Sequence, residues 1–127
     1  MTAPAVFPSF PVTLLHNPAC STSRNALALL RERGFAPTVV EYLKTPLDAQ
    51  ALRALVDELG IGVRGLLRDK EPVYAELGLA DPQWTDAQLL DVMARHPRLM
   101  NRPVVRTPLG ARLGRPLERV LEVLPPA

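Results

Sequence analysis

The first forty residues carry a strand–helix–strand pattern, which restricts the fold more than any other feature of the chain. An apolar run at 12–15 suits a buried strand, and a helical pattern at 26–33 follows it up to Gly34, a residue that suits a left-handed helix cap. A second run at 38–42 is β-branched and aromatic, as strands are. Parallel strands are joined through a crossover helix. The beginning of the chain therefore predicts a βαβ unit.

Residues 45–100 are predicted to be entirely helical. Thr45-Pro46 suggests the start of a helix whose apolar face ends at Gly60. Thr85, with Gln88 three residues later, matches a capping box and predicts another helix start. The mixed sequence between these two helices is predicted to hold shorter ones.

The last part of the chain predicts two strands and a helix. A short strand at 101–107 is followed by a turn and by a hairpin partner at 111–113. A final helix is predicted from Pro116, with Leu117, Val120, Leu121 and Leu124 facing the core. The order is that of an α/β, thioredoxin-like fold: a βαβ…ββα mixed sheet with an all-helical insertion at about 45–100.

The 127 residues suffice for one domain with an ordinary core, which we place at 12–127. Residues 1–11 are proline-rich and are predicted to form a flexible N-terminal arm, with neither a signal peptide nor a membrane span. A net charge of +2 without any basic run favours no nucleic-acid partner, and no stretch favours a membrane. The single cysteine argues against a disulfide-stapled secreted protein, so the predicted location is the cytoplasm.

Cys20 stands where the first predicted strand turns into its helix. N–H groups in the first turn of a helix lack intrahelical partners and favour an anion, and the thiolate is the reactive form of cysteine. The neighbouring Pro18, Ser21 and Thr22 are turn and capping residues rather than core residues. A helix start lowers a thiol pKa by only about one unit, so converging positive charge is also needed. These features predict that Cys20 is a nucleophile.

Other interpretations of Cys20 are less consistent with the sequence. A buried packing thiol is common, but the turn residues around Cys20 disfavour it. A phosphatase loop needs arginine six positions later, where this chain has Ala26, and a dithiol site needs cysteine at position 23, which is Ser23. One cysteine with His16 and His96 lacks metal-ligand spacing, so no metal is predicted. The pattern is a monothiol Cys-x-x-Ser site.

Several short motifs follow one another in order along the chain. They are His16-Asn17-Pro18-Ala19-Cys20, Ser23-Arg24-Asn25, Glu41-Tyr42-Leu43-Lys44-Thr45-Pro46, Val63-Arg64-Gly65-Leu66-Leu67-Arg68, Glu76-Leu77-Gly78-Leu79, His96-Pro97, Asn101-Arg102-Pro103, Thr107-Pro108-Leu109-Gly110, Arg112-Leu113 and Arg115-Pro116. Together they resemble the glutaredoxin-coupled arsenate reductases. The resemblance covers about residues 12–125.

The resemblance implies roles for individual residues. Cys20 corresponds to the nucleophile that attacks arsenate, and Arg68, Arg102 and Arg115 to three arginines that surround the oxyanion and stabilise the thiolate. The supporting positions that it implies are His16 near the thiol, Asn17, Ser23 and Arg24 in the loop, and Pro103 at the cis-proline position of the fold.

The resemblance also implies partners. Reducing arsenate takes two electrons, and one thiol cannot supply them alone, so glutathione is the expected cosubstrate and glutaredoxin the recycling partner, with no bound cofactor. Two alternatives stay open: another glutathione-dependent thiol reductase on the same fold, and a redox regulator that binds RNA polymerase. Regulators of that kind sense redox state through a Cys-x-x-Cys pair, whereas this chain has Ser23 in place of the second cysteine.

Overall fold

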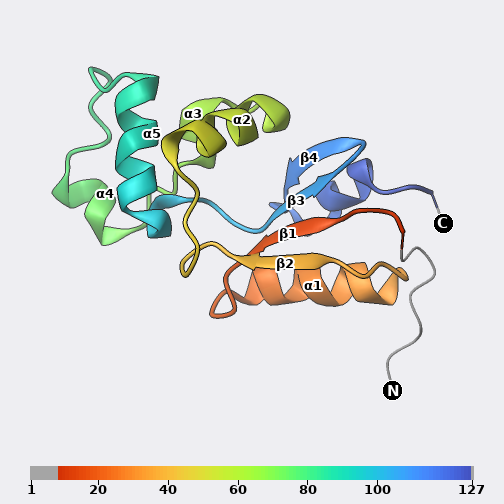
Figure 1. The fold of residues 1–127 in the computed structure, drawn as a ribbon. Helices are drawn as coiled ribbons and strands as arrows, with labels where there is room; N and C mark the ends of the chain where they lie inside the picture. Colours follow the sequence, from red (N-terminus) through yellow and green to blue (C-terminus); the bar gives the residue numbers. More distant parts are fainter. Residues whose placement is uncertain (1–8, 127) are drawn as a thin grey trace. The chain divides into compact units, whose positions relative to one another are not determined.

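The computed structural model describes residues 9–126, and their contacts form two compact units (Figure 1). One unit combines the described residues up to Tyr42 with those from Arg102 onward, and the other is Leu43–Asn101, nearly the predicted insertion. The single domain at 12–127 stays a prediction. Of the predicted N-terminal arm, residues 1–8 lie outside the described residues. Phe10 packs on the core, with its ring centroid 5.8 Å from that of Phe35.

The first unit is built on a mixed sheet. Its elements are β1 (Thr13–His16), α1 (Ser21–Glu32), β2 (Thr38–Glu41), β3 (Val104–Thr107), β4 (Gly110–Leu113) and the 3₁₀ helix η2 (Leu117–Val123). Among the described residues, four strands pair in the order β2-β1-β3-β4. The β1–β2 pair is parallel, with His16 opposite Glu41, and the other two pairs are antiparallel. This arrangement confirms the predicted thioredoxin-like βαβ…ββα order.

Helices α1 and η2 pack on the same face of this sheet. Leu14 of β1 and Val105 of β3 are paired in register, and both are fully buried in one apolar cluster with side chains from the two helices. The helical members of the cluster that are completely buried are Ala26, Leu30, Val120 and Val123. Burying one such Leu or Val contributes about 1.5–3 kcal/mol, so this cluster is what fixes α1 to the sheet.

The final helix differs from the prediction in type and therefore in its buried face. It is a 3₁₀ helix, with three residues per turn, so positions 117, 120 and 123 fall on one side. Val123 is consequently fully buried although it was not predicted to face the core, and Leu121 is only partly buried.

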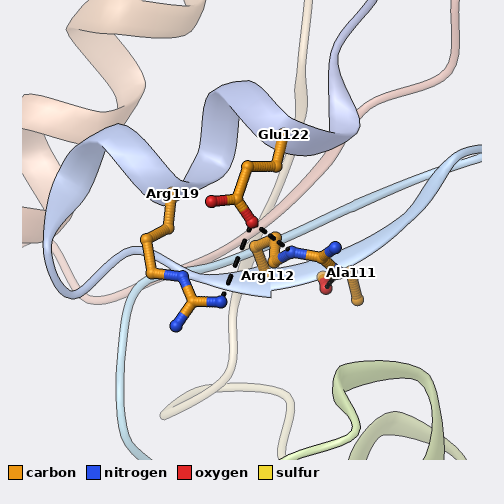
Figure 2. Close-up of polar contacts among 4 residues, drawn as sticks. All are labelled: Ala111, Arg112, Arg119 and Glu122. Atoms are coloured by element: carbon orange, nitrogen blue, oxygen red, sulfur yellow. Dashed lines mark hydrogen bonds and ion pairs between the residues drawn. The ribbon is translucent and has the colours of Figure 1, made fainter.

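An ion-pair cluster ties η2 to the hairpin (Figure 2). Arg112 Nε on β4 donates to Glu122 Oε1 at 2.8 Å, and Arg119 Nη2 lies 3.7 Å from the same oxygen. Arg112 Nη1 also donates to the Ala111 carbonyl at 2.7 Å, so the guanidinium is held at two edges. Through these contacts Glu122 connects β4 to η2.

The second unit is helical, as predicted. Its elements are α2 (Ala49–Leu59), α3 (Gly62–Leu66), α4 (Pro72–Glu76), α5 (Asp86–Arg95) and the 3₁₀ helix η1 (Pro97–Leu99). The predicted helix start at Thr45-Pro46 is wrong: α2 begins after Asp48, whose side chain accepts a hydrogen bond from the Ala51 N–H at 2.7 Å. Gly60 ends α2 in the left-handed conformation, as predicted (φ 67°). Among the described residues, no helix is long and apolar enough to cross a membrane.

Candidate active site around Cys20

Cys20 is the residue at which the connection after β1 becomes a helix. It is the N-cap of α1, with an extended backbone (φ −94°, ψ 121°) and a partly exposed side chain. The Arg24 N–H donates to the Cys20 carbonyl at 3.0 Å and closes the first helical turn, while the Cys20 N–H donates to the Asn17 carbonyl, also at 3.0 Å. The thiol is thus fixed at a helix start and is not sealed into the core.

The loop in front of Cys20 is held by one of its own side chains and by one from α1. Asn17 Oδ1 accepts a hydrogen bond from the Ala19 N–H at 3.0 Å, the local turn that asparagine favours. Arg24 Nη1 reaches back from α1 and donates to the Pro18 carbonyl at 2.8 Å. Asn17 and Arg24, both predicted from the sequence, therefore act on the backbone that carries Cys20.

A buried polar pair lies behind this loop. His16 Nδ1 and Ser23 Oγ are 2.7 Å apart, and Ser23 Oγ also accepts a hydrogen bond from the Asn17 N–H at 3.1 Å. Burial lowers the pKa of His16; Glu41 opposes this shift, and Arg24 adds to it. His16 is therefore favoured as the neutral imidazole, and the pair joins the end of β1 to the first turn of α1.

Two arginines from the C-terminal segment of the first unit, which begins at Arg102, bring positive charge to the sulfur. Arg115 Nη2 donates to Cys20 Sγ at 3.7 Å, while Arg115 Nε donates to the Arg102 carbonyl at 2.7 Å. The backbone of one arginine therefore anchors the guanidinium of the other. The Arg102–Pro103 bond is cis, as the resemblance implies, and so is the Arg115–Pro116 bond, which the sequence did not indicate.

Opposing effects set the pKa of Cys20. Burial raises the pKa of the thiol, but the Ser23 backbone N–H, the Arg102 guanidinium and the Thr22 backbone N–H lower it, and the net shift is downward. Within the described chain, the Cys20 side chain makes no N-capping hydrogen bond. These groups therefore act as a converging positive field that favours the thiolate.

Arg68 lies in the second unit. Its backbone N–H donates to the Leu99 carbonyl at 2.7 Å, next to an isolated bridge between Leu67 and Met100. Its Nε lies 3.3 Å from Glu71 Oε1, and both side chains are mostly buried. The first unit thus assembles Cys20 with every predicted site residue except Arg68, whose place at the site stays a prediction.

Two acidic residues lie beside predicted site residues and were not predicted to take part in the site. Glu41 raises the pKa of His16 and stands opposite it in the parallel register of β1 and β2. That register follows from aligning the two predicted strands, so it could have been found. Glu71 is three residues after Arg68, a spacing that permits a pair once the local backbone is known.

The arrangement has the parts that nucleophilic attack on an oxyanion requires. The sulfur is accessible, its pKa is lowered, and a guanidinium of Arg115 is in contact with it. Guanidinium groups bind two oxygens of a tetrahedral anion at once and stay charged at all relevant pH values. An oxyanion drawn to these arginines would meet the thiolate directly.

Comparison with known proteins identifies the family of the chain. The sequence model of the ArsC family matches residues 15–123. The chain belongs to the ArsC family. It is 53% identical over 116 residues to the arsenate reductase of Escherichia coli K12, covering 91% of this chain and 82% of that protein. It is also 48% identical over 114 residues to the uncharacterized protein YfgD of the same strain, covering 89% and 96%.

Solved structures of this family share the fold. The arsenate reductase from Vibrio cholerae superposes with a TM-score of 0.88 at 46% identity, covering 91% of this chain and 98% of that one. The ArsC match contains all the predicted site residues, from His16 to Arg115. The thioredoxin-like fold predicted from the order of elements is therefore the fold of the family.

Proposed function

We propose that this chain reduces arsenate to arsenite, with Cys20 as the nucleophile. The observation that carries the proposal is the contact between Arg115 Nη2 and Cys20 Sγ at 3.7 Å, since a guanidinium group of the kind that binds oxyanions lies against a partly exposed thiol whose pKa is lowered. Relatives named arsenate reductase are 53% and 46% identical to this chain over 91% of its length, and they support arsenate as that oxyanion.

In the proposed first step, the Cys20 thiolate attacks arsenic. A sulfur–arsenic bond forms, an arsenic–oxygen bond breaks, and the oxygen leaves as water after protonation. Arg102 and Arg115 hold the charge that develops on the remaining oxygens, and we assign Arg68 the same task from the family resemblance. Removal of one such donor from an oxyanion site costs about 10²–10³ in rate.

The second step needs a thiol from outside, because the chain has a single cysteine. Glutathione forms a second sulfur–arsenic bond as another oxygen leaves arsenic as water. A glutaredoxin thiolate then attacks the glutathione sulfur and breaks its bond to arsenic, so these two sulfurs become a mixed disulfide and arsenic keeps the electron pair as As(III). Water finally hydrolyses the bond between Cys20 and arsenic, which releases arsenite and regenerates the thiolate. No bound cofactor is required in this sequence, and its thiols belong to the reducing environment of the cytoplasm.

The supporting residues prepare the thiol. Asn17 and Arg24 fix the loop backbone, and the buried contact of His16 with Ser23 holds the first turn of α1, whose N–H groups favour the thiolate. Ser23 itself stands where a dithiol protein has its second cysteine, so an internal disulfide cannot compete with glutathione.

A coupled assay tests the proposal. Purified protein is given glutathione, glutaredoxin, glutathione reductase and NADPH, and NADPH oxidation is followed with and without arsenate. We expect arsenate-dependent oxidation that disappears in Cys20→Ser and when glutaredoxin is omitted. Turnover of disulfides without any response to arsenate would instead identify a general thiol reductase. Capture of RNA polymerase without turnover would identify a regulator, and either result would refute the proposal.

A further inference from the structure

The sulfur of Cys20 is open to a neutral oxidant as well as to an anion. Its side chain is partly exposed at the N-cap of α1, and the first turn of that helix has no acidic residue. Burial raises the pKa of the thiol, but the Ser23 backbone N–H, the Arg102 guanidinium and the Thr22 backbone N–H lower it by more. The thiolate is the form of cysteine that attacks a peroxide oxygen. The site therefore presents the reactive form of the sulfur to a small oxidant.

The Arg115 guanidinium is held with one donor at the sulfur and another donor free. Its Nε donates to the Arg102 carbonyl at 2.7 Å, and its Nη2 donates to Cys20 Sγ at 3.7 Å. Its Nη1 makes no hydrogen bond or ion pair with any residue that the structure describes. Guanidinium N–H groups donate in a fixed planar fork, so an oxygen beside the sulfur finds a charged donor already in place.

Cleavage of a hydroperoxide needs a thiolate and a donor for the leaving oxygen. The thiolate attacks one oxygen, the oxygen–oxygen bond breaks, and the other oxygen departs with a negative charge that must be stabilised. Cys20 and Arg115 supply these two parts within the first unit. We infer that this chain also reduces hydroperoxides, with Cys20 as the nucleophile and Arg115 as the donor to the leaving oxygen. The recycling of the sulfur, though not this first step, rests on the thiols of the proposed function.

Atoms and electrons balance with those thiols. The attacked oxygen keeps its hydrogen and becomes part of a sulfenic acid on Cys20, while the leaving oxygen takes a proton from water and departs as an alcohol, or as water when the substrate is hydrogen peroxide. The chain has no second cysteine, so the sulfenic acid condenses with glutathione and releases water. A glutaredoxin thiolate then attacks the glutathione sulfur and regenerates the Cys20 thiolate. The peroxide gains two electrons, and two thiol sulfurs become a disulfide.

The direction of one effect separates a donor to the leaving oxygen from simple activation of the thiol. Removal of a positive charge beside a thiolate raises its basicity, and its nucleophilicity then rises about threefold per pKa unit. Loss of a donor to the leaving oxygen slows the reaction instead, by about 10²–10³ in typical oxyanion sites. Iodoacetamide alkylates the same sulfur but releases iodide, a weakly basic ion that needs little help from a donor. The two reagents should therefore respond differently when Arg115 is removed.

Single-turnover rates in the full chain test the first step. Reduced protein is mixed with hydrogen peroxide or tert-butyl hydroperoxide at a pH where the alkylation profile shows every variant fully ionised. Loss of free thiol is followed, and dimedone with mass spectrometry identifies the sulfenic acid. We expect Arg115→Ala to lower the rate with peroxide about 10²-fold while alkylation by iodoacetamide is unchanged or faster.

Arg119→Ala is the matched control for this measurement. It removes an arginine from the exposed ion pair with Glu122 on η2 and should change neither rate. If Arg115→Ala changes the rates with peroxide and iodoacetamide by the same factor, or leaves the peroxide rate unchanged, Arg115 is not a donor to the leaving oxygen and the inference is overturned.

Turnover separates this inference from the proposed function. The coupled assay with glutathione, glutaredoxin, glutathione reductase and NADPH is run with tert-butyl hydroperoxide in place of arsenate. We expect NADPH oxidation above the rate without this chain, and the excess should disappear in Cys20→Ser. If hydroperoxide is turned over and arsenate is not, the proposed substrate fails and the inference stands. If arsenate is turned over and hydroperoxide is not, the inference fails and the proposed function stands.

Loss of folding is detected by thermal unfolding of each variant. If Arg115→Ala does not fold, Arg115→Gln takes its place, because glutamine keeps much of the length of the side chain without its charge or its paired donors. A fall in the rate with hydroperoxide alone again supports the inference, and an unchanged or increased rate contradicts it.

Discussion

Helices α1 and α5 begin in opposite ways. At α5 the Thr85 side chain accepts a hydrogen bond from the Gln88 N–H at 3.2 Å, and the Gln88 side chain accepts one from the Thr85 N–H at 2.9 Å. Asp86 adds a negative charge in the first turn. At α1 the N-cap is Cys20, the first turn has no acidic residue, and no side-chain cap is found in the described chain.

This difference separates a helix start that serves stability from one that serves chemistry. Side chains neutralise the first turn of α5, so it has little remaining attraction for an anion. The first turn of α1 keeps its N–H groups for the sulfur, and Ser23 there contacts His16 and the Asn17 N–H instead of capping the helix. The start of α1 is thereby left less stable, and in exchange a thiolate is favoured.

Cys20→Ser should have the largest effect and should sharpen the comparison most. Serine is among the best N-cap residues, so we expect this variant to lose arsenate turnover by more than about 10³-fold. At the same time it should gain about 0.5–1 kcal/mol in unfolding free energy, as α1 acquires the kind of cap that α5 has. The coupled assay and urea denaturation at acidic pH measure the two effects. Residual turnover near the wild-type rate would show that Cys20 is not the nucleophile.

The stability gain of Cys20→Ser should depend on pH. Because the pKa of Cys20 is lowered by folding, the thiolate contributes stability that is fully present above the unfolded pKa and is lost as the pH falls through the folded pKa. The advantage of the serine variant should therefore be greatest at acidic pH and shrink as the pH rises. An advantage independent of pH would mean that folding does not favour the thiolate.

Arg102→Ala should be next in size. Without this guanidinium the burial of Cys20 is less opposed, so the pKa of the thiol rises and the pH profile of its alkylation moves upward. Turnover should fall by about 10²–10³. Arg95→Ala, on α5, removes an equal charge from an exposed pair and serves as the control. If the alkylation profile of Arg102→Ala matches that of the control, Arg102 does not act on the sulfur.

The same contrast shows what the sequence can predict. The capping box of α5 and the glycine that ends α2 are local features, and both were predicted correctly. The start of α2 was wrong because Asp48, rather than the earlier Thr45-Pro46, supplies the cap. The 3₁₀ form of η2 was missed because its apolar residues fit more than one helical period.

For the candidate site, the sequence predicts which residues take part but not how they are arranged. The sequence identifies Cys20, the loop and the arginines. It cannot indicate that Arg115 Nε is anchored on the Arg102 carbonyl or that Glu71 lies 3.3 Å from Arg68 Nε. Every residue has the same backbone carbonyl, so the residue type does not show which carbonyl accepts a hydrogen bond. The backbone positions that decide this are set by the whole fold.

Thr85→Ala should affect stability without affecting chemistry. The substitution removes one half of the capping box, and we expect a loss of about 1 kcal/mol in unfolding free energy, measured by urea denaturation. The alkylation profile of Cys20 should not change. Thr85→Ser keeps the hydroxyl and should restore most of the stability. A large shift in the reactivity of Cys20 would contradict the division of labour between the two helix starts.

Glu122→Gln should have the smallest effect, because this carboxylate is at the surface. The hydrogen bond from Arg112 and the charge of Arg119 lower the pKa of Glu122, so its contribution to stability is present above the unfolded pKa and is lost as the pH falls through the folded pKa. Melting temperatures of wild type and variant should differ slightly at neutral pH and converge in acid. Glu118→Gln removes a charge from the same helix and is the control for charge alone. If the two substitutions change the melting temperature equally, the ion pair between η2 and β4 makes no specific contribution to stability.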